Sequence, residues 1–142
     1  MLKKTHRANM APLVSVVMPC LNQAQFLEVA VRSVLDQDYQ HVELIVSDGM
    51  STDGSIDLLV KLQAQYGDRL RWISQRDTGA AQAVNKALAL AHGEIVGWLN
   101  SDDIYMQGAV AKAVEHFQVR EAHQMVYGLA SYLNAVCLVT GI

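Results

Sequence analysis

Short runs of β-branched and aliphatic residues alternate with longer segments whose apolar residues recur at helical spacing. Such runs are typical of strands, and such periodic segments are typical of helices. The predicted strands lie at 13–19, 42–49, 70–75, 94–100 and 124–129. The predicted helices lie at 23–36, 53–66, 80–92 and 107–119. Because strands that alternate with helices form a mostly parallel sheet with helices on both faces, the sequence predicts an α/β fold with buried strands.

The chain has 142 residues, which is enough for one domain with a hydrophobic core but not for two. Residues 1–12 are basic with no apolar segment behind them, so they are read as a flexible N-terminal tail and 13–142 as the folded domain. The formal net charge is −3, and no basic patch dominates, so a nucleic-acid polymer is not an expected partner. Two distant cysteines without CxxC spacing fit a reducing compartment and predict a cytoplasmic protein.

Residues 125–142 carry no charged side chain and are just long enough for a marginal membrane span. The small and polar residues among them favour a buried strand with a trailing segment over a lipid-facing helix. We therefore expect no spanning helix here, and any association with the inner face of a membrane is expected to be peripheral.

Polar residues gather where the predicted strands end. The first strand runs into Asn22, the second into Asp48 and Gly49, the third into Asp77, and the fourth into residues 100–103. In open parallel sheets, ligands bind beyond the carboxyl ends of the strands. The sequence therefore predicts a ligand site at this edge. Asp48 fits a turn or a helix cap as well as it fits a ligand site, and Asp77 fits a turn better.

Asp102 and Asp103 are adjacent carboxylates at the end of the fourth predicted strand. Side by side, each raises the cost of ionising the other unless a cation lies between them. A hard divalent ion takes oxygen ligands and binds phosphates at the same time. Metal binding is therefore favoured over the alternative, in which the two aspartates cap the following helix.

Several familiar sites are missing from the sequence. It contains no GxxxxGK[ST] loop and no GxGxxG after the first strand, which excludes a P-loop and the usual dinucleotide-binding turn. No Ser-His-Asp or Cys-His pattern stands out, and the five histidines show no metal-ligand spacing. His92, near the end of a predicted helix, is read as a contact with the helix dipole, and Cys20 is read as a packing residue.

Two blocks of the sequence resemble the family 2 glycosyltransferases. The first is VSVVMPCLNQAQFLEVAVRSVLDQDY followed by VELIVSDGMSTDGSIDLL, and the second is RDTGAAQAVNKALALAHGEIVGWLNSDDIY. The family pattern is a strand ending in P-x-x-N, a strand leading into D-G-S-T-D-G, and a D-x-D element. The resemblance covers residues 13 to about 119, and it implies the GT-A fold, with the domain incomplete at its C-terminus.

The resemblance implies a role for each matching position. Asp48 would accept a hydrogen bond from the base, which is expected to be uracil. Asp102 would bind a Mn²⁺ or Mg²⁺ ion that bridges the diphosphate, and Asp103 would assist directly or through water. The donor-site residues that the resemblance implies are Pro19, Leu21, Asn22, Asp48, Asn85, Lys86, Asn100, Ser101 and Asp102.

Three departures from the family pattern stand out. Asn100 occupies the first position of the D-x-D element, where many relatives have aspartate. Val84 stands where many relatives have an arginine before the asparagine, so Arg76 or Lys86 would have to hold the diphosphate. The acidic residues after Asp103 match no family motif, so we expect the general base to be missing from this chain.

The resemblance implies a hexosyltransferase of polysaccharide biosynthesis at the cell envelope. It would transfer a sugar, with inversion, from a nucleoside-diphosphate sugar to a saccharide or lipid-linked acceptor. Two alternatives stay open. One is a truncated module that binds the nucleotide sugar without turnover. The other is a nucleotidyltransferase, although the residues PCLNQAQ lack the Gly-rich basic loop that such an enzyme needs after its first strand.

Overall fold

The computed structural model describes residues 11–119, 125–133 and 139–141. The chain divides into two compact units, residues 1–111 and 112–142. The first unit contains a four-stranded sheet, and the second contains a two-stranded antiparallel sheet of β5 (Tyr132–Leu133) and β6 (Val139–Gly141). The candidate site described below lies within the first unit.

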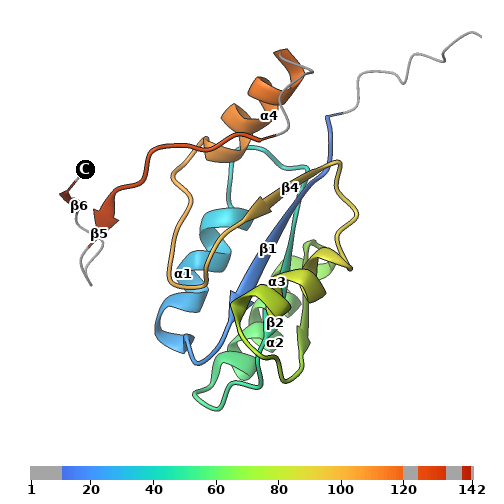
Figure 1. The fold of residues 1–142 in the computed structure, drawn as a ribbon, viewed down its shortest axis with the longest axis vertical. Coiled ribbons are helices and arrows are strands. Elements are labelled where there is room, and N and C mark those ends of the chain that lie inside the picture. The colour runs from blue at the N-terminus through green and yellow to red at the C-terminus, as the bar shows by residue number, and fades with distance from the viewer. Residues whose placement is uncertain (1–10, 120–124, 134–138, 142) are drawn as a thin grey trace, which may run out of the picture. The chain divides into compact units, whose positions relative to one another are not determined.

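The four-stranded sheet is parallel throughout. Its strands are β1 (Val14–Cys20), β2 (Val42–Asp48), β3 (Leu70–Ser74) and β4 (Ile95–Trp98), and they lie in the order β3-β2-β1-β4 (Figure 1). Cys20, at the end of β1, is level with Asp48, which is level in turn with Ser74. Strands β1, β2 and β3 therefore end together at one edge of the sheet, called the carboxyl edge below, and β4 ends level with Val17. The opposite edge, where the strands begin, is called the amino edge.

Helices cover both faces of this sheet, as predicted. These helices are α1 (Ala24–Leu35), α2 (Ser55–Tyr66) and α3 (Ala80–Leu88), and a 3-10 turn, η1 (Gly67–Arg69), precedes β3. A fourth helix, α4 (Ala109–Val119), runs across the boundary between the two units. Helix α3 lies on one face over β1 and β2, and α1 and α2 lie together on the other (Figure 1). Most predicted helix and strand boundaries are confirmed to within two residues.

The core explains why β1 and β2 are apolar on both sides. On the face covered by α3, Val17 and Ile45 pack against Val84 and Ala87. On the other face the fully buried side chains include Met18, Leu44 and Leu70 of the strands and Leu27, Leu59 and Leu62 of the helices. A strand between two helical layers meets no water on either side, which favours the continuous β-branched run seen in β1.

The prediction that the fourth strand is buried is wrong. Strand β4 alternates between partly buried and exposed residues, and the side chains of Val96 and Trp98 are 49% and 58% exposed. The reason is its place at the edge of the described sheet, where it pairs only with β1 while α3 lies over β1 and β2. An apolar run thus identifies a strand without showing whether another layer covers it.

The predicted fifth strand at 124–129 is also wrong where it can be assessed. Residues 125–129 form no strand, and Met125, Tyr127 and Leu129 are exposed, while Gln124 lies outside the described residues. Apolar composition alone does not make a strand, because a strand needs a partner for its backbone groups. No helix in the described part of the chain is long and apolar enough to cross a membrane.

Helix α3 ends at Leu88, four residues before the predicted end at His92. A tertiary contact overrides the helix propensity of the alanines, because the His92 backbone N–H donates to the carboxylate of Glu43 (2.9 Å) instead of continuing the helix. The His92 ring lies 3.9 Å from the same carboxylate and is 70% exposed. His92 is therefore a neighbour of Glu43, and its prediction as a helix-dipole contact is wrong.

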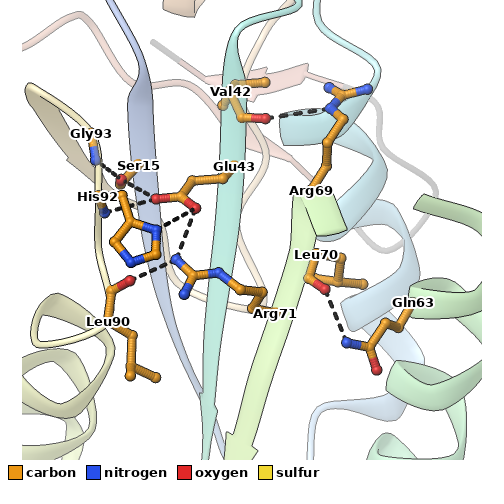
Figure 2. Close-up of polar contacts among 10 residues, drawn as sticks. All are labelled: Ser15, Val42, Glu43, Gln63, Arg69, Leu70, Arg71, Leu90, His92 and Gly93. Atoms are coloured by element: carbon orange, nitrogen blue, oxygen red, sulfur yellow. Dashed lines mark hydrogen bonds and ion pairs between the residues drawn. The ribbon is translucent and has the colours of Figure 1, made fainter. Parts of the chain in front are cut away.

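Glu43 is the centre of a polar cluster at the amino edge (Figure 2). Its buried carboxylate accepts hydrogen bonds from the Ser15 hydroxyl (2.6 Å) and from the Arg71 guanidinium (2.8 Å), in addition to the one from His92. Burial opposes ionisation of Glu43, but these hydrogen bonds outweigh it and lower the pKa of the carboxyl below its usual value. No pattern in the sequence indicates this cluster, because its members come from separate strands and a loop.

The same cluster fixes the segment that leads from α3 into β4. The Gly93 N–H donates to the Ser15 hydroxyl (2.7 Å), and Arg71 also donates to the Leu90 carbonyl (2.6 Å). Ser15, Glu43 and Arg71 come from three different strands, so the loop is held against the sheet from β3 across to β1 (Figure 2). The path of β4, and thus of the loop that follows it, depends on these contacts.

Candidate functional site at the carboxyl edge

The loops after β1 and β2 are joined to each other at the carboxyl edge. Asn22 accepts a hydrogen bond from the Thr52 N–H (2.9 Å), and its own N–H donates to the Ser51 hydroxyl (2.8 Å). Asn22 has a left-handed backbone with φ of 53°, which asparagine tolerates better than most residues. Asn22 is a typical helix-capping residue type, but it does not cap α1, since Gln23 precedes the helix and makes no side-chain cap.

Asp53, from the loop after β2, supplies the missing cap. It accepts hydrogen bonds from the Ala24 N–H at the start of α1 (2.8 Å) and from the N–H and hydroxyl of Ser55 at the start of α2 (3.0 and 2.6 Å). The Ser55 hydroxyl, followed by the Ala24 N–H, lowers the pKa of the Asp53 carboxyl. One carboxylate therefore serves two helix starts, which keeps both loops of the site in a fixed relation.

Asp48 is fully buried, and protein donors already engage both of its carboxylate oxygens. Oδ2 accepts hydrogen bonds from the backbone N–H groups of Met50 and Ser51 (both 3.0 Å) and from the Ser74 hydroxyl (2.7 Å). Oδ1 accepts a hydrogen bond from the Ser51 hydroxyl. Of the two uses that the sequence allowed for Asp48, the turn is therefore present, and it ties the loop after β2 to the end of β3.

Cys20 connects this turn to the loop after β4. Burial raises the pKa of the Cys20 thiol, and the Asp48 charge raises it further, so the thiol stays protonated and packs as expected. Ser101 is buried beside the same thiol, and its hydroxyl partly opposes this rise in the pKa. Asp48, Cys20 and Ser101 thus form a continuous row along the carboxyl edge, which places the loop of residues 100–103 at the end of β1.

The carboxylates on this loop differ in what they contact. The Asn100 amide donates to the Asp103 carboxylate (3.0 Å), and the Trp98 indole N–H donates to the Asn100 oxygen (3.2 Å). Asp102 is exposed and makes no hydrogen bond among the described residues. Asn100 therefore holds Asp103 in place, whereas the Asp102 carboxylate is available to a ligand.

These residues fit a divalent ion that arrives with its substrate. No group of three or more histidine, cysteine or acidic side chains that could hold a metal is found in the described part of the chain. Mg²⁺ and similar ions are often held by one or two carboxylates, with phosphate and water completing the shell. Asp102, with Asp103 beside it, supplies that number of carboxylates.

The loop after β3 meets the loops after β1 and β2 at Gly49. Asp77 accepts a hydrogen bond from the Gly79 N–H through Oδ1 (3.1 Å), as a turn residue does. Its Oδ2 lies 3.0 Å from the position that a Cβ on Gly49 would take, and Leu21 Cδ1 lies 3.4 Å from the same position. The position of Asp77 after the third predicted strand already placed it at this edge, although the sequence favoured a turn over a ligand site for it.

The remaining predicted site residues lie in different surroundings. Pro19 is partly buried and level with Ser47 across the sheet. Lys86 donates its ammonium to the Arg76 carbonyl (2.7 Å), so it supports the loop that carries Asp77. Asn85 is exposed on α3. The structure thus brings Leu21, Asn22, Asp48 and Ser101 to the carboxyl edge, and it occupies Lys86 with loop contacts.

A parallel sheet with helices on both faces defines an α/β fold, and the solved structures that it resembles are GT-A glycosyltransferases. The mannosyltransferase PcManGT from Pyrobaculum calidifontis, solved with GDP-Man and Mn²⁺, matches 77% of this chain and 33% of its own with a TM-score of 0.70 and 30% identity. S. aureus TarS 1-349, solved with UDP-GlcNAc, matches 77% of this chain and 32% of its own with a TM-score of 0.70 and 24% identity, and supports the fold alone.

The chain belongs to glycosyl transferase family 2, whose model matches residues 15–134. The putative teichuronic acid biosynthesis glycosyltransferase TuaG of Bacillus subtilis is 39% identical over 113 residues, which are 79% of this chain and 44% of that protein. The glycosyltransferase GlyG of Streptococcus pneumoniae is 32% identical over 124 residues, which are 87% of this chain and 41% of that protein. The chain therefore spans less than half the length of these relatives.

Proposed function

We propose that this chain forms the donor-binding part of a glycosyltransferase and holds a nucleoside-diphosphate sugar, together with Mn²⁺ or Mg²⁺, at the carboxyl edge. The observation that supports this most is the contrast within residues 100–103. Ser101 is buried against Cys20 and anchors the loop, while Asp102 beside it is exposed and has no hydrogen-bond partner in the part of the chain that the structure describes. An anchored loop with a free carboxylate suits a ligand that brings its own cation.

The side chains around this point would divide the work of binding. Leu21 and Pro19 would form the wall of the nucleotide pocket, with Asn22 holding the two loops together. Asn100 keeps its amide on Asp103, so it would position that carboxylate and does not supply a charge of its own. Asn85 and Asp103 are proposed to complete the polar lining. When bound, the cation stabilises the negative charge that develops on the leaving diphosphate oxygen.

Binding of the diphosphate would depend on a divalent ion held by Asp102 more than on a positively charged side chain. Lys86 was one of two expected replacements for the arginine that relatives carry, but its ammonium is bound to the carbonyls of Arg76 and Gln75 (2.7 and 3.5 Å). Arg76 is exposed at the same loop and is the better candidate. We therefore expect donor binding to depend strongly on a divalent ion.

Transfer itself requires a general base that accepts the proton of the attacking hydroxyl. Glu115 lies exposed on α4, and Glu121 lies outside the described residues. Proton transfer contributes roughly a hundredfold or more to such reactions, so the 142-residue chain is expected to bind donor well and to transfer slowly.

The proposed acceptor is a saccharide or a lipid-linked saccharide. The name of TuaG, a putative glycosyltransferase of teichuronic acid biosynthesis, supports an acceptor of this kind in a cell-envelope polymer. We propose that transfer inverts the anomeric configuration, on the basis of the family resemblance.

The test is a calorimetric titration of the chain with UDP and with GDP, each with and without MnCl2. The wild type is expected to bind at least one of them, with Mn²⁺ increasing the affinity, and Asp102→Ala is expected to lower the Mn²⁺-dependent affinity at least about tenfold. Asp68→Ala is the matched control, because Asp68 is an exposed aspartate in η1, at the amino edge. Absence of binding, or equal affinity in the Asp102 and Asp68 variants, would reject the proposal.

A second measurement separates an enzyme from a module that binds without turnover. The chain is incubated with UDP-GlcNAc or GDP-Man and Mn²⁺, and release of the nucleoside diphosphate is followed over time. Release that Asp102→Ala abolishes supports an enzyme, whereas binding without release supports the module. Appearance of inorganic pyrophosphate from a sugar phosphate and a nucleoside triphosphate would instead identify a nucleotidyltransferase.

A further inference from the structure

The buried state of Asp48 leaves little of its carboxylate for a ligand. Its two oxygens already accept four hydrogen bonds, three on Oδ2 and one on Oδ1, and the residue is fully buried. A carboxylate has about four lone-pair positions in total. A nucleotide base that approaches this edge therefore meets a carboxylate that is fully buried and has at most one free lone pair, on Oδ1.

Asp77 is the other carboxylate at the same place, and it is less engaged. Oδ1 accepts one hydrogen bond, from Gly79, and Oδ2 accepts none among the described residues. Oδ2 lies over Gly49, and a Cβ at this position would be 3.0 Å from it, so the absence of a side chain on Gly49 allows this close approach. Lys86 holds the loop behind it through the Arg76 carbonyl. The carboxylate of Asp77 is therefore both available and positioned.

One exposed apolar side chain lies close to this carboxylate, and a second is exposed on the same loop. Leu21 approaches the same point above Gly49 to 3.4 Å and is 54% exposed, and Met50, the next residue after Gly49, is also 54% exposed. Exposed large aliphatic side chains beside a carboxylate provide a surface for the face of a base and an acceptor for its edge. Other exposed apolar residues of the chain, such as Val60 on α2, have no such contact described for them.

We infer that Asp77 recognises the base of the nucleotide and that it favours guanine over uracil. This inference rests on the function proposed above, and it names the donor class more closely. Guanine presents two neighbouring donors on one edge, the N1–H and the 2-amino group, and a carboxylate accepts both. Uracil presents a single N3–H between two carbonyl oxygens, and both of these repel a carboxylate. Asp77 retains free lone pairs on both oxygens for the guanine edge.

The inference is tested by titrating GDP and UDP, with Mn²⁺ present, into wild type and Asp77→Asn. Wild type is expected to bind GDP at least about tenfold more tightly than UDP, since hydrogen bonds to a charged group contribute this much. Asp77→Asn keeps the size and the acceptor for Gly79 but loses the charge, and its amide can donate to a uracil carbonyl. It is expected to lower GDP affinity about tenfold and to leave UDP affinity unchanged or higher.

Two further variants make this result specific. Asp68→Asn makes the same chemical change at the amino edge and is expected to leave the GDP-to-UDP ratio as in wild type. Gly49→Ala places a methyl group 3.0 Å from Asp77 Oδ2 and 3.4 Å from Leu21, so it displaces the carboxylate without removing its charge. It is expected to lower the GDP-to-UDP ratio in the same direction as Asp77→Asn but by less, with an unchanged circular dichroism spectrum, because both contacts are flexible side-chain ends.

The outcomes separate this inference from the proposed function. If neither GDP nor UDP binds with Mn²⁺, both are rejected. If nucleotides bind but wild type prefers UDP, or Asp77→Asn leaves the ratio unchanged, the inference is rejected and the proposed function stands. The inference is supported if the ratio of GDP affinity to UDP affinity falls in Asp77→Asn and stays as in wild type in Asp68→Asn.

Discussion

Replacing Glu43 with alanine is expected to lower the free energy of unfolding by about 3 kcal/mol. The carboxylate is buried and accepts hydrogen bonds from Ser15, His92 and Arg71, which come from both neighbouring strands and from the α3–β4 segment. Its removal leaves the partly buried Arg71 guanidinium without its counter-ion and the Ser15 hydroxyl and His92 N–H without an acceptor. Urea unfolding followed by circular dichroism measures the loss.

A matched ion pair shows why burial decides the size of this effect. Glu28 also pairs with an arginine at 2.8 Å, but Glu28 and Arg32 are 39% and 36% exposed on one helix. Water screens such a pair, so Glu28→Ala is expected to have a much smaller effect than Glu43→Ala. Equal losses in the two variants would contradict the assignment of Glu43 as an anchor of the amino edge.

The ionisation of Glu43 also makes the free energy of unfolding depend on pH. The folded state lowers the pKa of Glu43, so its contribution is fully present above the pKa of the unfolded chain and is lost as pH falls through the folded pKa. The wild type is therefore expected to lose stability below about pH 4, where an unperturbed glutamate titrates. Glu43→Gln is expected to flatten this part of the pH profile, and an identical profile in both proteins would show that Glu43 makes no such contribution.

Replacing Gly93 with alanine is expected to lower the free energy of unfolding by a similar amount, about 3 kcal/mol. A Cβ at this position would lie 2.6 Å from the Leu13 carbonyl oxygen, the Ser15 nitrogen and the Ser15 hydroxyl. Two of these atoms belong to the backbone beside or within β1 and have no freedom to move. The added methyl group must therefore push the start of β4 away from β1 and break the Gly93–Ser15 hydrogen bond.

Gly128→Ala is the control for this variant. Gly128 has no atom within 4 Å of the added Cβ and no left-handed backbone angle, so a methyl group fits without strain. Thermal unfolding is expected to show a lower midpoint for Gly93→Ala and an unchanged midpoint for Gly128→Ala. A normal midpoint for Gly93→Ala would show that the α3–β4 segment is free to shift, which would contradict its role in fixing the path of β4.

The strands and most helices could be predicted from the sequence because their apolar periodicity reports local burial. The runs at 13–19 and 42–49 became β1 and β2 because two helical layers bury both faces of these strands. The run that became β4 has a similar composition, yet half of its residues are exposed. Whether a second layer covers a strand depends on distant parts of the chain, and no local pattern contains that information.

The location of the polar site could be predicted from the sequence, but which of its carboxylates are free to bind a ligand could not. The strand ends placed Asp48, Asp77 and residues 100–103 at one edge, as the parallel order of the strands requires. The sequence did not show that Asp48 is engaged by Ser51 and Ser74, nor that Gly49 lets Asp77 approach. These contacts join three loops that are far apart in the sequence, so only the assembled fold shows them.

The most direct test of the account is to locate Mn²⁺ on the protein by its paramagnetic broadening of amide NMR signals. With GDP or UDP present, we expect strong broadening at 101–103 and at Cys20 to Asn22, and none at the amino edge near Val14 and Leu70. Asp102→Ala is expected to remove the broadening. Broadening centred on the amino edge or on 125–133, or a pattern unchanged in Asp102→Ala, would contradict a metal-bound nucleotide site at the carboxyl edge.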